Sequence, residues 1–192
     1  MEEAVFYNLS QDETLGGDSP SIHKIPSQAA LKAYIDSKAG SGGPNYFYVE
    51  DASGAANTLT IRKSNNALAD KVFEWSYDKA TWTEITITDT TGVSIAVPAN
   101  GRVYLRGDNG ALAEGSNYIN IKCSSAFDVA GDATTLISKA GRLYQAYTYA
   151  FRSLFYQATQ LKHAHDLTLF TGIVADYCYR AMFSGCTSLL TA

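Results

Sequence analysis

From Asn45 to Cys123, apolar and polar residues alternate along short stretches of the chain. A period of two places successive side chains on opposite faces of a β-strand, so that one face can be buried. Clusters rich in glycine, aspartate and asparagine separate these stretches and are typical of turns. The pattern predicts strands at residues 45–50, 58–63, 71–78, 81–88, 92–98, 101–108 and 117–123. Seven short strands at this spacing indicate a β-sandwich of the immunoglobulin or fibronectin-III type.

A helical period precedes the strands, over residues 27–38. Ser27 is a suitable N-cap, and Leu31, Tyr34 and Ile35 then share one narrow apolar face. A helix this short is marginal in water by itself, so this face needs a cover. Either the chain's own sandwich covers it, or other copies do so around a symmetry axis. We expect self-association, with Leu31, Tyr34 and Ile35 as the oligomer interface.

The C-terminal part of the chain contains one pattern twice. Residues 149–164 align without a gap with residues 177–192, at an offset of 28 residues. Self-similarity at such a period is typical of solenoids, in which each unit buries its apolar face only by stacking on the next. The expected core of the repeats consists of Leu154, Phe155, Leu161, Met182, Phe183, Cys186 and Leu189.

The segment between the strands and the repeats predicts two elements. Residues 127–131 indicate a further strand, and residues 133–151 are expected to be helical at their end. The predicted fold class is therefore mainly β, with a short N-terminal helix, a seven-stranded sandwich and α+β repeats that form a short solenoid. The expected domains are an anchor and oligomerisation helix, a glycine-rich linker, the sandwich and the repeats, at residues 1–40, 41–45, 46–123 and 124–192.

Composition narrows the function. The chain of 192 residues has a formal net charge of −4 and no Lys/Arg cluster, so nothing predicts nucleic-acid binding. No apolar run has the length of a membrane span, and the acidic N-terminus does not resemble a signal peptide. Three scattered cysteines are too few for a disulfide framework and predict buried free thiols, as in a protein made in a reducing cytosol.

His163, His165 and Asp166 form the densest polar cluster of the sequence. A His-x-His pair on a strand places both rings on one face, which suits a metal ion. No further cysteine or carboxylate pattern completes such a site, and no nucleophile has a recognisable base. Asp166 and Asp176 are the carboxylates that a glycan hydrolase would need, but nothing in the sequence pairs them. We therefore expect no catalytic residue, no metal site and no cofactor.

Tyrosines are abundant around the repeats. They suit a stacked core, which is the simplest interpretation of most of them. Exposed tyrosines also offer a large contact area at a low cost in entropy, so that they suit binding of a sugar ring or a protein. Tyr144, Tyr147 and Tyr156 are the candidate receptor contacts.

The second repeat copy resembles a known family. Its aromatic cluster, followed by MFSGCTSL, is similar to the BspA-type leucine-rich repeat of bacterial surface and phage proteins. Phe183, Gly185, Cys186 and Leu189 stand at the positions of that motif. The first copy departs from it, with Gln157 in place of the glycine and Ala158 in place of the cysteine. The resemblance covers about a quarter of the chain and implies a helix-like segment that ends in phenylalanine and leads into a short strand.

A second resemblance lies in the predicted helix. Residues 25–36, with the sequence IPSQAALKAYID, are similar to a phrase that is frequent in phage tail-fibre and head-fibre proteins near their attachment or trimerising segments. The resemblance implies a homo-oligomer, with a trimer expected.

These features predict a non-enzymatic structural protein of a phage particle, a head fibre or a tail fibre, assembled in the host cytoplasm. Its expected partners are its own copies, other virion proteins and a host-surface glycan or protein, with no nucleic acid and no membrane. A bacterial cell-surface adhesin of BspA type is the first alternative, and a fibre-borne glycan hydrolase is the second.

Overall fold

The computed structural model describes residues 45–141, 143 and 145–191. The predicted helix at residues 27–38, its interface residues Leu31, Tyr34 and Ile35, and Tyr144 lie outside these residues. Residues 46–192 form one compact unit. In the described part of the chain no helix has the length and apolar character that a membrane span requires.

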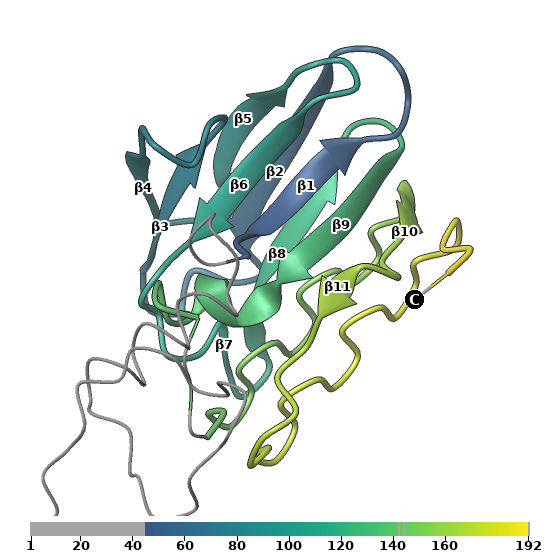
Figure 1. The fold of residues 1–192 in the computed structure, drawn as a ribbon. Coiled ribbons are helices and arrows are strands. Elements are labelled where there is room, and N and C mark those ends of the chain that lie inside the picture. The colour runs from purple at the N-terminus through teal and green to yellow at the C-terminus, as the bar shows by residue number, and fades with distance from the viewer. Residues whose placement is uncertain (1–44, 142, 144, 192) are drawn as a thin grey trace, which may run out of the picture. The chain divides into compact units, whose positions relative to one another are not determined.

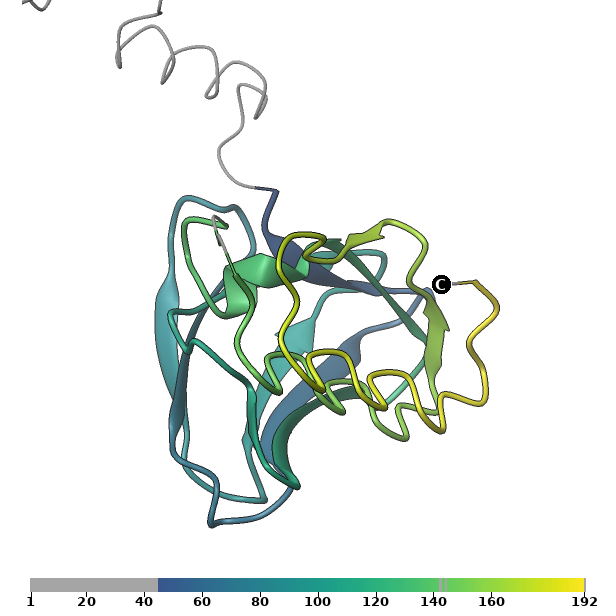
Figure 2. The same ribbon diagram turned by 90° about the horizontal axis from the view of Figure 1, so that it is seen from below.

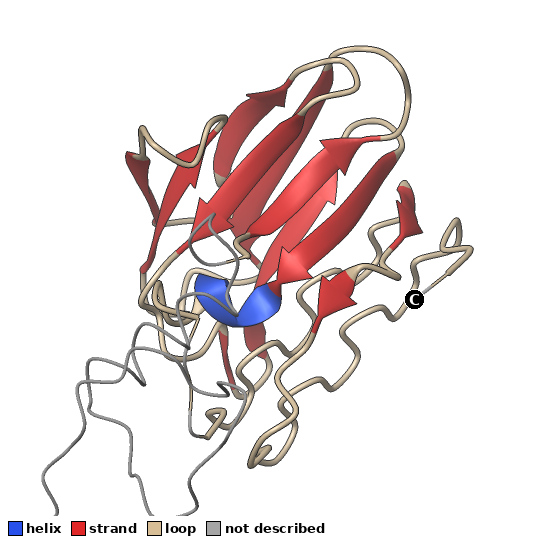
Figure 3. Cartoon of the chain, viewed as in Figure 1, coloured by secondary structure: helices blue, strands red, loops and turns tan. Residues whose placement is uncertain are grey.

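The described unit is built from two β-sheets (Figures 1 and 3). The larger sheet has the strand order β10-β9-β1-β6-β3-β4, with β11 also paired to β9, and the smaller has the order β5-β2-β8-β7. The strands are β1 Phe47–Asp51, β2 Asn57–Lys63, β3 Lys71–Ser76, β4 Thr83–Ile87, β5 Val93–Val97, β6 Arg102–Arg106, β7 Ala113–Glu114, β8 Asn117–Cys123, β9 Phe127–Asp132, β10 Leu161–His163 and β11 Leu167–Thr168. The predicted mainly β, two-sheet architecture is confirmed.

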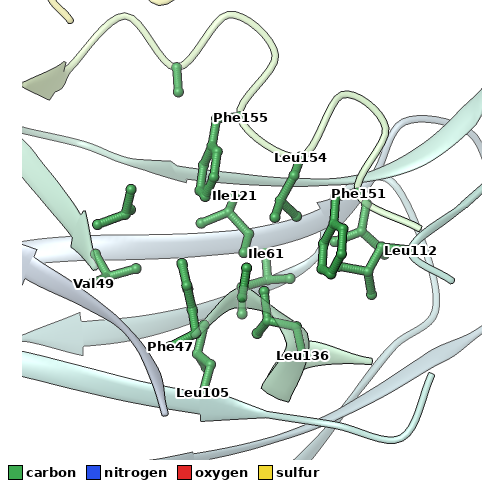
Figure 4. Close-up of a cluster of buried hydrophobic side chains, with 14 of the residues drawn as sticks. Phe47, Val49, Ile61, Leu105, Leu112, Ile121, Leu136, Phe151, Leu154 and Phe155 are labelled. Atoms are coloured by element: carbon green, nitrogen blue, oxygen red, sulfur yellow. The ribbon is translucent and has the colours of Figure 1, made fainter. Parts of the chain in front are cut away.

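Alternation along the strands builds the core. In β2 every second residue is buried, so that Leu59 and Ile61 point inward while Thr58 and Arg62 face outward. The inward residues of both sheets meet in one apolar cluster (Figure 4). Each large side chain removed from water there stabilises the fold by about 1.5–3 kcal/mol.

The larger sheet continues beyond residue 124, the expected boundary between sandwich and repeats. The segment after it forms β9, which pairs antiparallel with β1 over four residues, for example Val49 opposite Val129. Because β9 completes the larger sheet, the sandwich extends to Asp132, whose side chain caps the short 3-10 helix η1, Ala133–Leu136. The sandwich and the segment that follows it therefore belong to one unit.

The helix expected at the end of residues 133–151 is not formed. Among the described residues of this segment only η1, at its start, is helical, and the chain then enters a series of turns (Figure 3). Tyr149, Ser153 and Gln157 have φ angles of 63°, 57° and 55°. A left-handed residue at every fourth position cannot continue a right-handed helix, because the chain changes direction at each one.

Two such series lie side by side. We call residues 145–163 the first coil and residues 173–191 the second coil; Figure 2 shows them running next to each other in green and yellow. The second coil has its left-handed residues at Tyr177, Ala181 and Gly185, again 28 positions after those of the first. Isolated parallel bridges join the two coils at their ends, at Gln145 with Ile173 and at His163 with Thr191.

A regular hydrogen-bond ladder holds the coils together. Alternate backbone N–H groups of the first coil donate to carbonyls of the second, from Tyr149 N to Asp176 O through Gln157 N to Ser184 O. The aromatic rings are stacked in register: Phe155 lies 5.4 Å from Phe183 at an interplanar angle of 13°, and Phe151 lies 5.4 Å from Tyr179 at 5°. The two copies of the repeat thus occupy equivalent positions in adjacent coils.

Candidate binding groove

The seven residues predicted as the core of the repeats are buried to different degrees. Leu154, Phe155 and Leu161 are fully buried and Met182 is 3% exposed. The remaining three, Phe183, Cys186 and Leu189, are half-buried and pack against the same core. Phe151, Leu154 and Phe155 point from the first coil toward residues of both sheets (Figure 4). The first coil is therefore a third wall of the sandwich core.

The two described candidate receptor tyrosines have different surroundings. Tyr147 is 56% exposed and lies close to Gly110. Tyr156 is half-buried and borders a hollow between the first coil and the outer face of the smaller sheet. Tyr156 therefore lines a concave surface.

We call this surface the Arg62–Lys122 groove. One hollow of about 160 Å³ lies at the coil and a second of about 280 Å³ lies along the sheet, and Arg62 and Lys122 line both. The other residues that line the first hollow are Lys63, Ser64, Thr90, Tyr118, Asn120, Tyr156 and Gln157, and those of the second are Thr60, Thr91, Cys123 and Ser124. The lining is rich in hydroxyl and amide groups.

Strand register brings the two cations together. β2 pairs antiparallel with β8, which sets Thr60 opposite Lys122 and Arg62 opposite Asn120. Side chains of these outward positions share one face of the sheet, and diagonal neighbours on a face are within reach of long side chains. Arg62 and Lys122 thus become neighbours although 60 residues separate them in the sequence.

Asn120 fixes the coil wall of the groove. Its side chain is buried, and its amide nitrogen donates to the carbonyls of Ser153, Leu154 and Tyr156 at 3.4, 3.3 and 3.0 Å. The neighbouring Ile121 N–H also donates to Leu154 O, at 2.8 Å. Tyr156 is therefore held at a defined position over the sheet.

Two tyrosines meet at the coil end of the groove. The rings of Tyr118 and Tyr156 lie 5.9 Å apart at an interplanar angle of 71°, an edge-to-face contact. The backbone N–H of Tyr118 donates to Ser64 Oγ at 2.9 Å. Burial raises the pKa of Tyr118, so its hydroxyl group is neutral and can donate a hydrogen bond.

The groove carries an uncompensated positive charge. Several cations of the described residues have carboxylate partners: Lys63 with Asp70, Lys71 with Glu114, Arg102 with Glu50, and Arg106 and Lys139 with Glu74. Arg62 and Lys122 have no such partner within the described residues. Burial, and then the charge of Arg62, lower the pKa of Lys122, because both disfavour its ammonium form.

The two histidines of the polar cluster, His163 and His165, each lie beside a carboxylate. His163 Nδ1 lies 2.9 Å from Asp128 Oδ1, and His165 Nε2 lies 3.2 Å from Asp166 Oδ2. Each ring therefore has its own carboxylate. The part of the chain that the structure describes contains no group of three or more His, Cys, Asp and Glu side chains arranged to hold a metal ion.

The cysteines are free thiols. Burial raises the pKa of Cys123 to about 12 and also raises those of Cys178 and Cys186. A thiol with a raised pKa is a poor nucleophile at neutral pH. The surroundings of these side chains therefore favour packing over chemistry.

Most of the groove residues were not candidates from the sequence. Tyr156 was one, whereas Arg62, Tyr118, Asn120 and Lys122 were not. Their outward positions in two predicted strands were visible as the polar phase of the alternation. What could not be seen was the pairing of β2 with β8.

Comparisons of this chain with protein-family models, with curated proteins and with solved structures found no match.

Proposed function

We propose that the protein is a non-enzymatic structural protein of a phage particle, a head fibre or a tail fibre, which displays its coils for attachment to the host surface. The similarity of residues 25–36 to a phrase of phage fibre proteins supports this function. So does the similarity of residues 177–192 to the BspA-type repeat, a module of surface and phage proteins. A bacterial cell-surface adhesin of BspA type is the alternative with the same display function.

The register of the two coils is the observation that carries the proposal. A 28-residue unit whose copies stack ring on ring, as Phe155 does on Phe183 at 5.4 Å, is a repeat that extends by addition of further units. We assign the coils to a leucine-rich-repeat solenoid of the BspA type. Such repeats serve as extended binding surfaces, and here they lie on a sandwich that we take to be an immunoglobulin-like or fibronectin-III-like spacer.

Oligomerisation would make weak contacts effective. If residues 1–40 anchor the protein and join its copies as a trimer, each particle presents several equivalent surfaces at once. Linked binding sites can exceed the affinity of one site by about 10²–10⁴ without any new contact. Light scattering on the full chain, with Leu31→Asp as the interface variant and Lys32→Glu as the control on the opposite face, tests this step. A trimer that Leu31→Asp dissociates supports it, and a monomer for the unaltered chain contradicts it.

Gold-labelled antibodies against residues 46–192 provide the direct test of the function. We expect label on purified phage particles, at the capsid for a head fibre or at the tail for a tail fibre. Label on the envelope of uninfected cells would instead establish the cell-surface adhesin. The proposal would be overturned if the purified particles carried no label and the chain were found only as free protein that washes away from them.

A further inference from the structure

We propose that the Arg62–Lys122 groove binds a carbohydrate that carries a carboxylate group. This inference names the ligand class for the proposed attachment function and rests on that function for its biological meaning. Its structural basis is separate and lies in the charge, the shape and the chemistry of the groove.

The charge selects an anion. Two neighbouring cations without a carboxylate partner among the described residues repel each other, in a chain whose net charge is −4. An anion between Arg62 and Lys122 would replace this repulsion by two charge-assisted hydrogen bonds, and the planar guanidinium group matches a carboxylate in two-point contact. Burial is the main cause of the lowered pKa of Lys122, and the charge of Arg62 adds to it.

The lining selects a sugar as the carrier of that anion. Hydroxyl and amide groups of Thr60, Thr90, Thr91 and Gln157 line the two hollows on either side of the cations. They match the hydroxyl groups of a pyranose ring, which both donate and accept hydrogen bonds. The Tyr156 ring, half-buried at the end of the groove, offers a flat surface against which the C–H face of a sugar can pack.

The shape fits an oligosaccharide better than a nucleic acid. Two open hollows that share Arg62 and Lys122 form a short track across the sheet, with room for sugar units on both sides of the charged unit. A nucleic-acid surface needs a broad basic field that follows many phosphates. The groove offers only two cations without a carboxylate partner among the described residues, Arg62 and Lys122, which is too few for such a field.

Titration of the full chain with matched sugars tests the proposal. The probes are trigalacturonate with its fully methyl-esterified form, and sialyllactose with its methyl ester, so that each pair differs only in the charged group. Lys122 and the Tyr118 and Tyr156 rings are observed by NMR. We expect at least one acidic probe to shift these signals, with binding that weakens as salt is added, and the neutral partner to shift none of them. Equal binding of the neutral partner, or no shift with either acidic probe, overturns the proposal.

Variants locate the site. We expect Arg62→Gln and Lys122→Gln each to weaken binding about tenfold, since each removes one charge-assisted contact. Arg102→Gln removes the same charge from the other sheet, where Arg102 pairs with Glu50, and should leave binding unchanged. Tyr156→Ala should weaken binding severalfold while Tyr156→Phe retains it, because the ring is what packs. Equal losses for all three charge variants would show a non-specific effect of net charge and would contradict the groove.

Two further probes separate a sugar site from a general anion site. Inorganic phosphate and acetate carry the charge without the ring. If either binds as tightly as the acidic sugar, the groove is an anion site and the carbohydrate assignment is wrong. Tight binding of a short duplex DNA would likewise overturn it.

Failure of this inference and failure of the proposed function are distinguishable. A protein that labels phage particles but ignores acidic sugars retains its function and loses this ligand. A protein that binds acidic sugars through Arg62 and Lys122 but is absent from particles retains the site and loses the virion assignment.

Discussion

The first and second coils have similar sequences and the same backbone conformation, yet their side chains are buried to different degrees. Phe155 is fully buried and its equivalent Phe183 is half-exposed; Leu161 is fully buried and Leu189 is not. The first coil lies between the sandwich and the second coil, whereas no described residue packs on the outer side of the second. Position in the stack, and not the repeat sequence, therefore sets the burial of each copy.

Hydrogen bonds show the same asymmetry. The N–H groups of residues 149, 151, 153, 155 and 157 donate to the second coil, and carbonyls of the first coil accept from the sandwich, as Ala150 O does from Leu112 N. The equivalent N–H groups of residues 177, 179, 181, 183 and 185 have no backbone acceptor within the described residues. The outer edge of the second coil thus presents donors alone.

A donor-only edge constrains self-association. Two copies related by a two-fold axis would set N–H against N–H if they met at this edge, and no backbone ladder could form. A two-fold dimer in which the second coils pair edge to edge is therefore disfavoured.

Truncation of the equivalent phenylalanines should give the largest difference between the coils. Phe155→Ala removes a ring that is fully buried between the sheets and the second coil and should cost about 3–5 kcal/mol of the free energy of unfolding. Phe183→Ala should cost about 1–2 kcal/mol, because its ring is only half-buried. Urea unfolding followed by tryptophan fluorescence measures both.

The control for this pair is Leu190→Ala, whose side chain is 72% exposed and which should change stability by less than about 0.5 kcal/mol. Equal losses for Phe155→Ala and Phe183→Ala would mean that the second coil is covered in solution as fully as the first.

The rate of amide hydrogen exchange should differ between the N–H groups of the first coil and the equivalent N–H groups of the second. We expect the N–H groups of Phe151, Ser153 and Phe155 to exchange at least about 100-fold more slowly than those of Tyr179, Ala181 and Phe183, which corresponds to roughly 2.7 kcal/mol of local opening. Hydrogen–deuterium exchange read by NMR resolves the individual amides. If the protection of the N–H groups of the second coil grew with protein concentration, another copy would be covering this edge. That result would contradict the expectation that copies do not pair there.

Loss of the Asn120 amide should loosen the first coil from the sandwich. Asn120→Ala leaves three coil carbonyls without that donor in a buried place and should cost about 1–3 kcal/mol. Asn117→Ala, at the half-exposed start of the same strand, is the matched control and should be nearly neutral. Thermal unfolding measures the loss; if the two variants have the same stability, Asn120 does not hold the coil.

The sandwich could be predicted from the sequence because its signal is local. Alternation in stretches such as TLTIRK marks a strand whatever its partner, and the seven predicted strands correspond to β1–β6 and β8. The pairing of β9 with β1 could not be predicted, since nothing near Phe127 indicates a partner strand about 80 residues earlier. For the same reason the groove remained hidden, because it depends on the register that sets Arg62 opposite Asn120.

In the repeats, the long-range equivalence of residues could be predicted and their local conformation could not. The 28-residue offset correctly predicts which residues are equivalent, but not the conformation that they share. Tyr149, Ser153 and Gln157 adopt left-handed φ angles that are disfavoured for every residue except glycine. Their sequence therefore gives no turn signal. Stacking and the hydrogen-bond ladder of the coils stabilise a conformation against local preference, and only Gly185 indicates it in the sequence.

Substitution of Gly185, the last left-handed residue of the second coil, should give the smallest effect. It tests most directly whether the coils hold their residues in a conformation that local preference disfavours. Gly185→Ala places a Cβ at φ 78°, 3.0 Å from Gln157 Cγ, and should cost about 1–2 kcal/mol. Gln157→Gly relieves the same backbone strain in the first coil and should stabilise by about 0.5 kcal/mol, since greater freedom of the unfolded chain offsets part of the gain. Gly54→Ala, at φ 75° with no atom within 4 Å of the new Cβ, isolates the backbone strain from the contact. If Gly185→Ala lowers the free energy of unfolding no more than Gly54→Ala does, the coils adjust to the added methyl group. If Gln157→Gly lowers it, the Gln157 side chain contributes more stability than its backbone strain costs.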